Sequence, residues 1–340
     1  MSTQNKTLVI GDLHFDNKFR GMLDAQREAV IKICDLHKEC DKVIFLGDLM
    51  MHRNPRPEVL LALNKMIDTV SQDREVFILR GNHDSVTKSD DGVTSLSLFE
   101  NSKVKVITHT YIDHKNKWMF IPHYEDEQKI KDDLDRAPEG YTIFGHFGYH
   151  GVLNSAGDAD FSLSISDFKN PTILGHIHTE GRNGNVTVLG TPYSTNFGEA
   201  GKDCYYGILD ERGLDKLPSK YGPRHLVVDY DNVEDNLDWI NKDSKPTDYT
   251  LLRININTIN EDQDRIADLC DKIKVGSLEI KYKPLLDEKD EFETDGRVFT
   301  TALNDELIEY YINSSKTKIN KDELLSGLKL IHENQQDRNQ

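Results

Sequence analysis

The fold is decided by residues 75–84, EVFILRGNHD, in which an apolar run ends in a glycine and three polar residues. The same form occurs twice earlier, because residues 7–12 read TLVIGD and residues 42–48 read KVIFLGD. Short apolar runs that end at glycine are typical of buried strands followed by sharp turns. Between these runs, residues 24–40 and 57–70 carry apolar residues at helical spacing. Alternating strands and helices indicate an α/β core with right-handed crossovers.

The following part of the sequence, up to about residue 222, favours strands. Short apolar runs separated by polar turns predict strands, with one helical pattern at residues 125–136 among them. The expected strands cover residues 104–108, 118–122, 141–144, 172–174, 186–189 and 205–209. A β-rich half after an α/β half predicts a four-layer sandwich of two mixed β-sheets flanked by helices, which is an α/β (α+β) fold.

Beyond residue 222 the pattern indicates smaller units. Residues 250–257, 262–274 and 277–283 predict a strand, a helix and a strand of a small α/β domain. A stretch poor in apolar residues then predicts a linker, and two amphipathic patterns, at 303–313 and 321–332, predict C-terminal helices. The expected organisation is a main domain at 1–222, a small domain at 223–286, an acidic linker at 287–300 and helices within 301–340.

The composition is that of an ordinary globular protein, with 37% hydrophobic and 30% charged residues in a chain of 340. The sequence begins without a signal-like segment, and it contains no apolar stretch of the length that a membrane span needs. Its four cysteines are scattered, which favours free thiols in a reducing compartment. We therefore expect a soluble, cytoplasmic protein. The net charge of −17 favours a substrate that is not a long polyanion; otherwise, metal cations and a partner protein would have to supply the attraction to nucleic acid.

Five short motifs built from Asp, His and Asn follow the apolar runs. The carboxyl ends of parallel strands meet at one edge of a sheet, so these side chains are expected to converge. Alternate residues of an extended segment point the same way, so the D-x-H and H-x-H spacings place both members in one site. The motifs are Asp12-Leu13-His14, Gly47-Asp48, Gly81-Asn82-His83-Asp84, Gly145-His146 and Gly175-His176-Ile177-His178.

The side chains of these motifs make up a donor set for two metal ions. Two carboxylates, one amide and four imidazoles can hold two divalent cations if one carboxylate bridges them. The cations then outweigh the aspartates in charge, and the excess can hold a phosphate group. Nitrogen and oxygen donors without thiolate suit manganese, iron and zinc. A lone histidine or Gly-Asp pair is more often structural, but five such motifs at successive strand ends indicate a binuclear site.

In their order and spacing, the five motifs resemble those of the calcineurin-like metallophosphoesterase superfamily, over roughly residues 7–200. The resemblance implies two metal ions bridged by Asp48. The ligands of the first would be Asp12, His14, Asp48 and His178. The ligands of the second would be Asp48, Asn82, His146 and His176. His83 would act on the leaving group as a general acid or stabilise charge in the transition state, and Asp84 would orient it.

Three less specific features resemble SbcD-type DNA nuclease subunits. Residues 190–199, GTPYSTNFGE, are similar to the stretch after the last metal motif in that family. The strand–helix–strand unit stands where the family carries a DNA-facing capping domain, and the C-terminal helices stand where it docks on an SMC-like ATPase of SbcC/Rad type. The resemblance implies a manganese-dependent DNA exo- or endonuclease of recombination or repair that forms a homodimer and binds this ATPase. A phage recombination endonuclease subunit, located in the host cytoplasm, would be a close relative.

Two questions stay open at the level of sequence. The resembling family often carries His or Asp three residues after the bridging aspartate, where this sequence has Met51, followed by His52. His52 either enters the site through a shifted turn or lies on the surface, and the positions of His109, His114, His123 and His150 are equally open. The function also has alternatives: a stand-alone phosphodiesterase or phosphatase acting on nucleotides or proteins, and a mainly structural subunit of a recombination complex.

Overall fold

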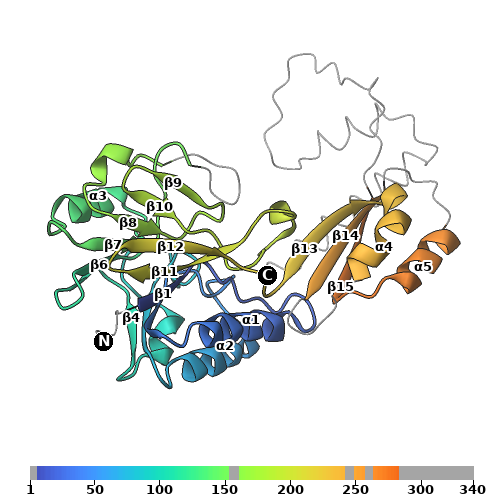
Figure 1. Ribbon diagram of the computed structural model, residues 1–340, viewed down its shortest axis with the longest axis horizontal. Coiled ribbons are helices and arrows are strands. Elements are labelled where there is room, and N and C mark those ends of the chain that lie inside the picture. The colour runs from blue at the N-terminus through green and yellow to red at the C-terminus, as the bar shows by residue number, and fades with distance from the viewer. Residues whose placement is uncertain (1–5, 153–160, 242–248, 257–262, 283–340) are drawn as a thin grey trace, which may run out of the picture. The chain divides into compact units, whose positions relative to one another are not determined.

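The computed structural model describes residues 6–152, 161–241, 249–256 and 263–282, and within them the strands form three sheets (Figure 1). The first sheet has the order β12 (Gly213–Pro218), β11 (Tyr205–Asp210), β1 (Lys6–Ile10), β2 (Cys40–Phe45), β3 (Glu75–Leu79) and β4 (Val104–Ile107). The second has the order β5 (Tyr111–Asp113), β6 (Trp118–Ile121), β7 (Thr142–Gly145), β8 (Thr172–Leu174), β10 (Val186–Val188) and β9 (Gly181–Asn183).

Both six-stranded sheets are mixed, with parallel strands at the centre. In the first sheet β1, β2, β3 and β4 run parallel, and β11 joins β1 in the antiparallel sense. In the second sheet β6, β7, β8 and β10 run parallel, and β5 and β9 close the two edges in the antiparallel sense. The parallel centres bring several strand ends to the same edge of each sheet.

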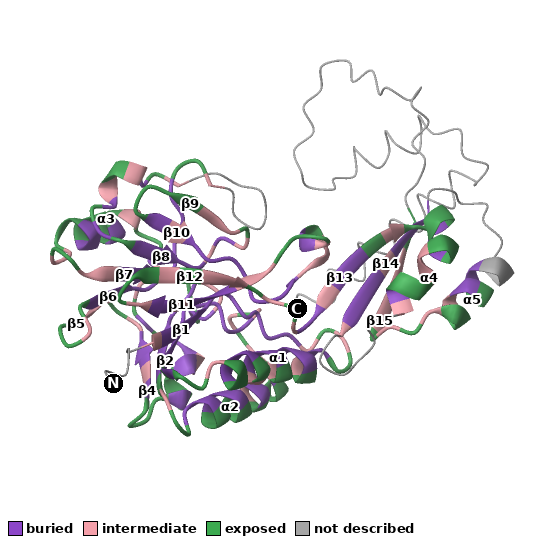
Figure 2. Ribbon diagram, in the orientation of Figure 1, coloured by how far each residue is buried: buried purple, intermediate pink, exposed green. Residues whose placement is uncertain are grey.

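The sheets and helices make the four layers that the sequence predicts. Helices α1 (Met22–Leu36) and α2 (Pro57–Val70) pack on the outer face of the first sheet, and α3 (Glu127–Asp135) packs on the outer face of the second (Figure 1). Successive side chains of a strand point to opposite faces of its sheet, so they alternate between two layers with a period of two residues. Leu8 and Ile10 of β1 face the helices, whereas Val9 faces the core between the two sheets. Figure 2 shows the resulting buried strands and the exposed outer faces of α1 and α2.

One predicted boundary is wrong. The helical pattern predicts a helix from Asp24 to Cys40, but α1 ends at Leu36 and Cys40 is the first residue of β2. The Arg74 guanidinium explains the turn, because it donates to the backbone carbonyls of Cys34 at 2.8 Å and Cys40 at 3.1 Å. It thus ties the end of the helix to the start of the next strand. The helix predicted at Pro57 begins at that residue.

A third, smaller sheet consists of β13 (Arg224–Asp229), β14 (Thr250–Ile256) and β15 (Ser277–Tyr282), all parallel. Helices α4 (Val233–Asn241) and α5 (Gln263–Lys272) connect these strands, and a separate apolar core lies between them and the sheet. Four short 3₁₀ helices complete the described elements: η1 (Ser95–Phe99), η2 (Ile165–Asp167), η3 (Phe197–Glu199) and η4 (Tyr230–Asn232).

The chain divides into two compact units, residues 1–285 and 286–340. The second unit lies outside the described residues, and so do the predicted linker at 287–300 and the predicted helices within 301–340. The predicted boundaries between domains stay predictions. Among the helices that the structure describes, none combines the length and the apolar character needed to cross a bilayer.

Candidate metal centre

The five sequence motifs lie at the carboxyl ends of five parallel strands, where the two large sheets meet. Asp12 and His14 follow β1, Asp48 follows β2, and the Asn82–Asp84 segment follows β3 in the first sheet. His146 directly follows β7, and His176 and His178 follow β8, in the second sheet. The structure thus brings together in space motifs that are up to 166 residues apart in the sequence.

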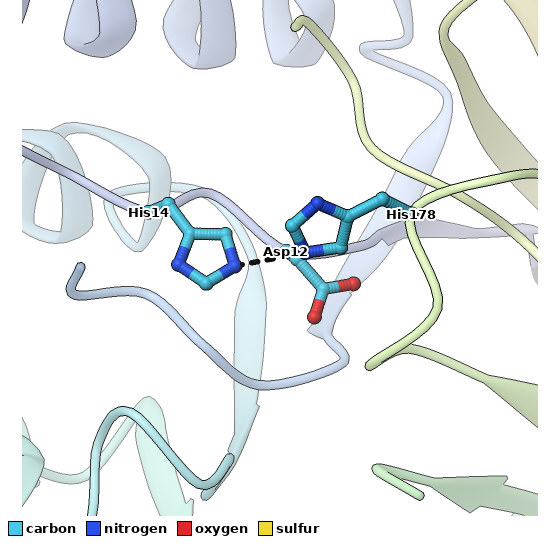
Figure 3. A group of neighbouring side chains, drawn as sticks. All are labelled: Asp12, His14 and His178. Atoms are coloured by element: carbon cyan, nitrogen blue, oxygen red, sulfur yellow. Dashed lines mark hydrogen bonds between the residues drawn. The ribbon is translucent and has the colours of Figure 1, made fainter. Parts of the chain in front are cut away.

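One group of donors consists of Asp12, His14 and His178, whose ligand atoms lie within 4.8 Å of one another (Figure 3). The two imidazoles face each other, and their Nε2 atoms are 3.0 Å apart. The Asp12 carboxylate is fully buried and accepts a hydrogen bond from the backbone N–H of His176 at 2.9 Å. That bond ties the strand end of the first sheet to the strand end of the second.

A second group consists of Asp48, His146 and His176, again within 4.8 Å, and the Asn82 amide joins it. The Asn82 Oδ1 atom is 3.1 Å from His146 Nε2 and 3.0 Å from His176 Nδ1. Asp48 Oδ2 is 3.3 Å from His146 Nε2 and 3.7 Å from His14 Nε2. One oxygen atom of Asp48 therefore reaches both groups, as a bridging carboxylate must.

Backbone strain concentrates in these loops. His14, Asp48 and His176 have positive φ angles of 45°, 49° and 73°, a region that residues other than glycine rarely adopt. Gly47, at φ 107°, permits the turn before Asp48, and a Cβ atom there would lie 2.4 Å from His146 Nδ1. The surrounding structure holds these residues in an unfavourable conformation, which is typical of functional sites.

The charges of the buried groups show that the cluster attracts positive charge. Against the opposing effect of burial, the carboxylates of Asp48 and Asp12 raise the pKa of His146 to about 9. Burial lowers the pKa of His176 to about 3, and the nearby His146 ring acts in the same direction. Against the effect of burial, the His146 ring lowers the pKa of Asp48 well below its usual range. Two buried carboxylates among nitrogen donors form a site that suits divalent cations.

His83 lies beside both groups. Its ring packs edge-on against His14 with centroids 4.9 Å apart, and it forms a third donor set with His14 and Asp48. The backbone N–H of His83 donates to Asp48 Oδ1 at 2.8 Å, and its Nδ1 lies 2.6 Å from the carbonyl oxygen of Met51. When Nδ1 carries the proton and donates it to that carbonyl oxygen, Nε2 remains for proton transfer.

Asp84 acts on the backbone of the loops. Its Oδ1 accepts from the N–H of Met50 at 3.2 Å and its Oδ2 from the N–H of Gly81 at 2.9 Å. Burial, followed by the charge of Asp48, raises the pKa of Asp84 to about 7. These two hydrogen bonds join the loop after β2 to the loop after β3, whereas the His83 ring nitrogen contacts the carbonyl oxygen of Met51.

The histidines left open by the sequence fall into two classes. The side chain of His52 is 69% exposed, and its Nε2 lies 4.0 Å from Asp16 Oδ1, outside the donor groups. His109, His114 and His150 are also exposed. His123, in contrast, packs beside His176 and His146, with ring centroids 5.8 and 6.3 Å away. Burial and the nearby His146 lower the pKa of His123 to about 4, so it is neutral at pH 7.

Sequence reasoning missed one residue that the structure places against a predicted ligand. Glu199 is buried, and its Oε1 lies 2.5 Å from His178 Nδ1. The residue closes the stretch GTPYSTNFGE, so a signal existed in the sequence. Its pairing with a histidine 21 residues earlier depends on the path of the chain through β9 and β10.

Comparisons with known proteins agree with this geometry. A family model described as calcineurin-like phosphoesterase matches residues 6–215, which is more than half of the chain. The chain therefore belongs to the calcineurin-like phosphoesterase family. Members of this family are metal-dependent phosphoester hydrolases with binuclear metal sites, and the Asp and His groups described above fit such a site.

Several solved structures are distantly similar, whereas a search of curated proteins gave no match. The nuclease MPE of Pseudomonas putida is 17% identical with a TM-score of 0.28, and the match covers 43% of this chain and 63% of that one. An archaeal phosphodiesterase is 12% identical (TM-score 0.34; 63% and 99% covered), and a dimetal phosphatase from Danio rerio is 14% identical (TM-score 0.38; 63% and 98% covered). The match to the Pseudomonas putida nuclease spans less than two thirds of that protein. Likenesses this distant carry no argument about the substrate.

Proposed function

We propose that this protein is a manganese-dependent DNA nuclease subunit that hydrolyses phosphodiester bonds at DNA ends in recombination or repair, together with an SMC-like ATPase. The position of Asp48 is the observation that supports the hydrolysis of phosphodiester bonds. Its Oδ2 atom lies between His146 Nε2, at 3.3 Å, and His14 Nε2, at 3.7 Å, so one carboxylate serves both donor groups. This arrangement fits a pair of metal ions acting on one phosphate.

The residues would divide the work as follows. Asp12, His14, Asp48 and His178 would hold one ion, and Asp48, Asn82, His146 and His176 the other. When bound, the two divalent cations supply positive charge to the phosphate oxygens and acidify water. The fixed ring of His83, with Nδ1 held by Met51, leaves Nε2 to donate a proton to the leaving oxygen. Asp84 keeps the loops of Asp48 and His83 together through Met50 and Gly81.

Support for DNA as the substrate comes from the SbcD-like sequence features and from a polar cavity beside the centre. The cavity measures about 420 Å³ and is lined by the loop that follows His14 and the loop that follows Met51. Its lining includes Lys18, Arg56 and His52, which can contact phosphates, and Asp16, which can accept hydrogen bonds from sugar or base. A substrate that extends beyond one phosphate would use such a surface.

The partner and the oligomeric state complete the proposal. A net charge of −17 is unfavourable for holding a polyanion, so an ATPase that supplies phosphate contacts would account for DNA binding. In the resembling family such an ATPase docks on the C-terminal helices, and a homodimer forms through the first two helices. Leu61 of α2 is 61% exposed and Leu36 of α1 is 47% exposed, so each helix carries an apolar side chain that a partner could cover.

The decisive experiment replaces His83 by Ala. We expect manganese-dependent cleavage of linear duplex DNA to fall about 10²- to 10⁴-fold, because a general acid is lost, while two Mn²⁺ remain bound per chain. Metal content is measured by atomic emission, and cleavage is measured with and without the co-purified ATPase. His114→Ala, at an exposed histidine, is the control. Undiminished cleavage by His83→Ala would exclude the role given to His83.

The same assays separate the alternatives. Rapid turnover of nucleotides or phosphoproteins with no cleavage of DNA would favour a stand-alone phosphodiesterase or phosphatase. Full biological activity in a protein that binds no metal would favour a mainly structural subunit. The complete set of donors at the strand ends argues against that last possibility.

A further inference from the structure

We propose that Glu199 is a positioning residue of the metal centre: its carboxylate fixes the His178 ring so that the opposite ring nitrogen faces Asp12 and His14. This inference rests on the proposed function in one respect, namely that His178 is a metal ligand. It adds a residue outside the five motifs, from the stretch at 190–199.

The two nitrogens of His178 face different partners. Nδ1 lies 2.5 Å from Glu199 Oε1, and Nε2 lies 3.0 Å from His14 Nε2, within the donor group that includes Asp12. A carboxylate on Nδ1 keeps the proton there and leaves the Nε2 lone pair for a metal. The carboxylate also increases the basicity of the ring, which strengthens its bond to a cation.

Glu199 is itself held in place. Its Oε2 accepts from the backbone N–H of Thr195 at 2.7 Å. Its Oε1 accepts from Thr195 Oγ1 at 2.9 Å and from Asn196 Nδ2 at 2.8 Å, in addition to His178. The side chain is only 8% exposed. A carboxylate with this many donors has one orientation, so it can fix the orientation of the ring that it contacts.

The position of Glu199 means that it acts through His178. Nδ1 and Nε2 point away from the ring on different sides, so the carboxylate lies behind the imidazole as seen from Asp12 and His14. Glu199 instead lines a second cavity of about 530 Å³, together with residues such as Tyr193 and Trp239. Contact with the reacting phosphate is therefore not required for its effect.

A purely structural role is the competing explanation. Thr195, Asn196 and Glu199 bond to one another around the 3₁₀ turn η3, and these bonds alone could account for a buried glutamate. The two roles differ in what they predict. A structural role predicts lower stability with unchanged metal affinity, whereas a positioning role predicts weaker binding of metal to a protein that still folds.

The test is a titration of the full chain, stripped of metal by a chelator, with Mn²⁺ alone in an isothermal calorimeter. Glu199→Gln keeps the size of the side chain and removes its charge. We expect the Kd of one of the two Mn²⁺ sites to rise about 10- to 100-fold. Glu199→Asp should restore part of the affinity. Glu180→Gln is the matched control, because it removes the same charge two residues after His178 from a side chain that pairs with Lys216.

Two further measurements keep the inference open to refutation. The visible absorption of Co²⁺ bound to Glu199→Gln should differ from that of the wild type, since the ring orientation around the ion changes. If Glu199→Gln does not fold, Thr195→Val removes one bond to the carboxylate, and we expect it to weaken one Mn²⁺ site up to about fivefold. If both Mn²⁺ sites keep their affinity in these variants, the role of Glu199 is overturned and the proposed function is not. A wild-type protein that binds no Mn²⁺ would overturn the proposed function as well.

Discussion

The donor loops at the edge of the two large sheets differ from the small third sheet in what they bury. The loops bury charged and polar side chains, whereas the third sheet buries mainly apolar ones. Both regions are built on parallel strands joined by helices, and both have buried apolar cores. At the edge of the large sheets, however, Asp12, Asp48 and His146 are buried with 2% exposure or less, and three residues other than glycine adopt positive φ. Within the described part of the third sheet, positive φ is not found in any residue.

The edge of the large sheets departs from simple apolar packing, whereas the third sheet does not. Buried charge and backbone strain both reduce the free energy of unfolding, so a fold retains them only where something else compensates. At the large sheets, the metal ions proposed above would provide this compensation. The third sheet holds its strands with aliphatic contacts, and its strand ends carry the weak polar pair Asn255–Asp229, at 3.4 Å. Substitutions in the loops of the large sheets should therefore change metal binding and hydrolysis, whereas substitutions in the third sheet should change stability.

The largest effect should come from Asp48→Asn. This change removes the one carboxylate that reaches both donor groups, so both ions lose a ligand and the charge that attracts them. We expect manganese-dependent hydrolysis of bis(p-nitrophenyl) phosphate to fall by at least about 10³-fold, which corresponds to about 4 kcal/mol in the barrier. Asp135→Asn, which changes a surface pair with Lys169, serves as the control. If Asp48→Asn turned over near the wild-type rate with two ions bound, Asp48 would not be the bridge.

A smaller effect on a different property is expected for Leu252→Ala in β14. Leu252 is fully buried in the core of the third sheet, and its truncation should cost about 2–5 kcal/mol of stability there. Urea unfolding followed by the fluorescence of Trp239 in α4 measures this loss of stability. The two proteins compared are Trp118→Phe and Trp118→Phe with Leu252→Ala, so that Trp239 is the one tryptophan left. Hydrolysis of the small phosphodiester should stay near the reference rate. A loss of hydrolysis in step with unfolding would mean that the two regions are not independent.

The sequence predicts the large sheets well because their strands are continuous apolar runs. The runs at 7–12, 42–48 and 75–84 end in the loops that the structure places at the metal centre, and the strand predicted at 172–174 matches β8. Parallel strands bring their ends together whatever the details of packing, so the meeting of the donor residues follows from the pattern. The roles of individual residues as ligands stay predictions until metal binding is measured.

Some features, β12, α4 and the position of His52 among them, are missing from the sequence-based prediction for different reasons. Strand β12 is an edge strand with the polar sequence GLDKLP, and it is defined by its pairing with β11 rather than by its own apolar residues. Helix α4 carries Val233, Leu237 and Ile240 at helical spacing, so a signal was present there among many polar residues. The position of His52 depends on a loop, and loops are set by tertiary contacts.

The smallest effect is expected where the two regions meet, at His225 of β13. His225 is 2% exposed, its ring packs against Phe197 with centroids 4.8 Å apart, and its Nδ1 lies 3.0 Å from Ser194 Oγ. Burial, with a smaller effect of the charge on Arg253, lowers the pKa of His225 to about 4. The unfolded chain, with a pKa near 6.5, therefore binds more protons than the folded chain between these values.

The stability that His225 contributes should be complete above about pH 6.5 and should be lost as the pH falls towards 4, by about 3 kcal/mol at most. Urea unfolding in the presence of a chelator, from pH 7 to pH 4, measures this slope. In His225→Asn the slope should be shallower than in the wild type, because one group that titrates on unfolding is gone. His109→Asn, at an exposed histidine, controls for the loss of an imidazole in general. An identical slope in wild type and His225→Asn would show that this ring accepts its proton without disturbing the contact between Ser194 and β13.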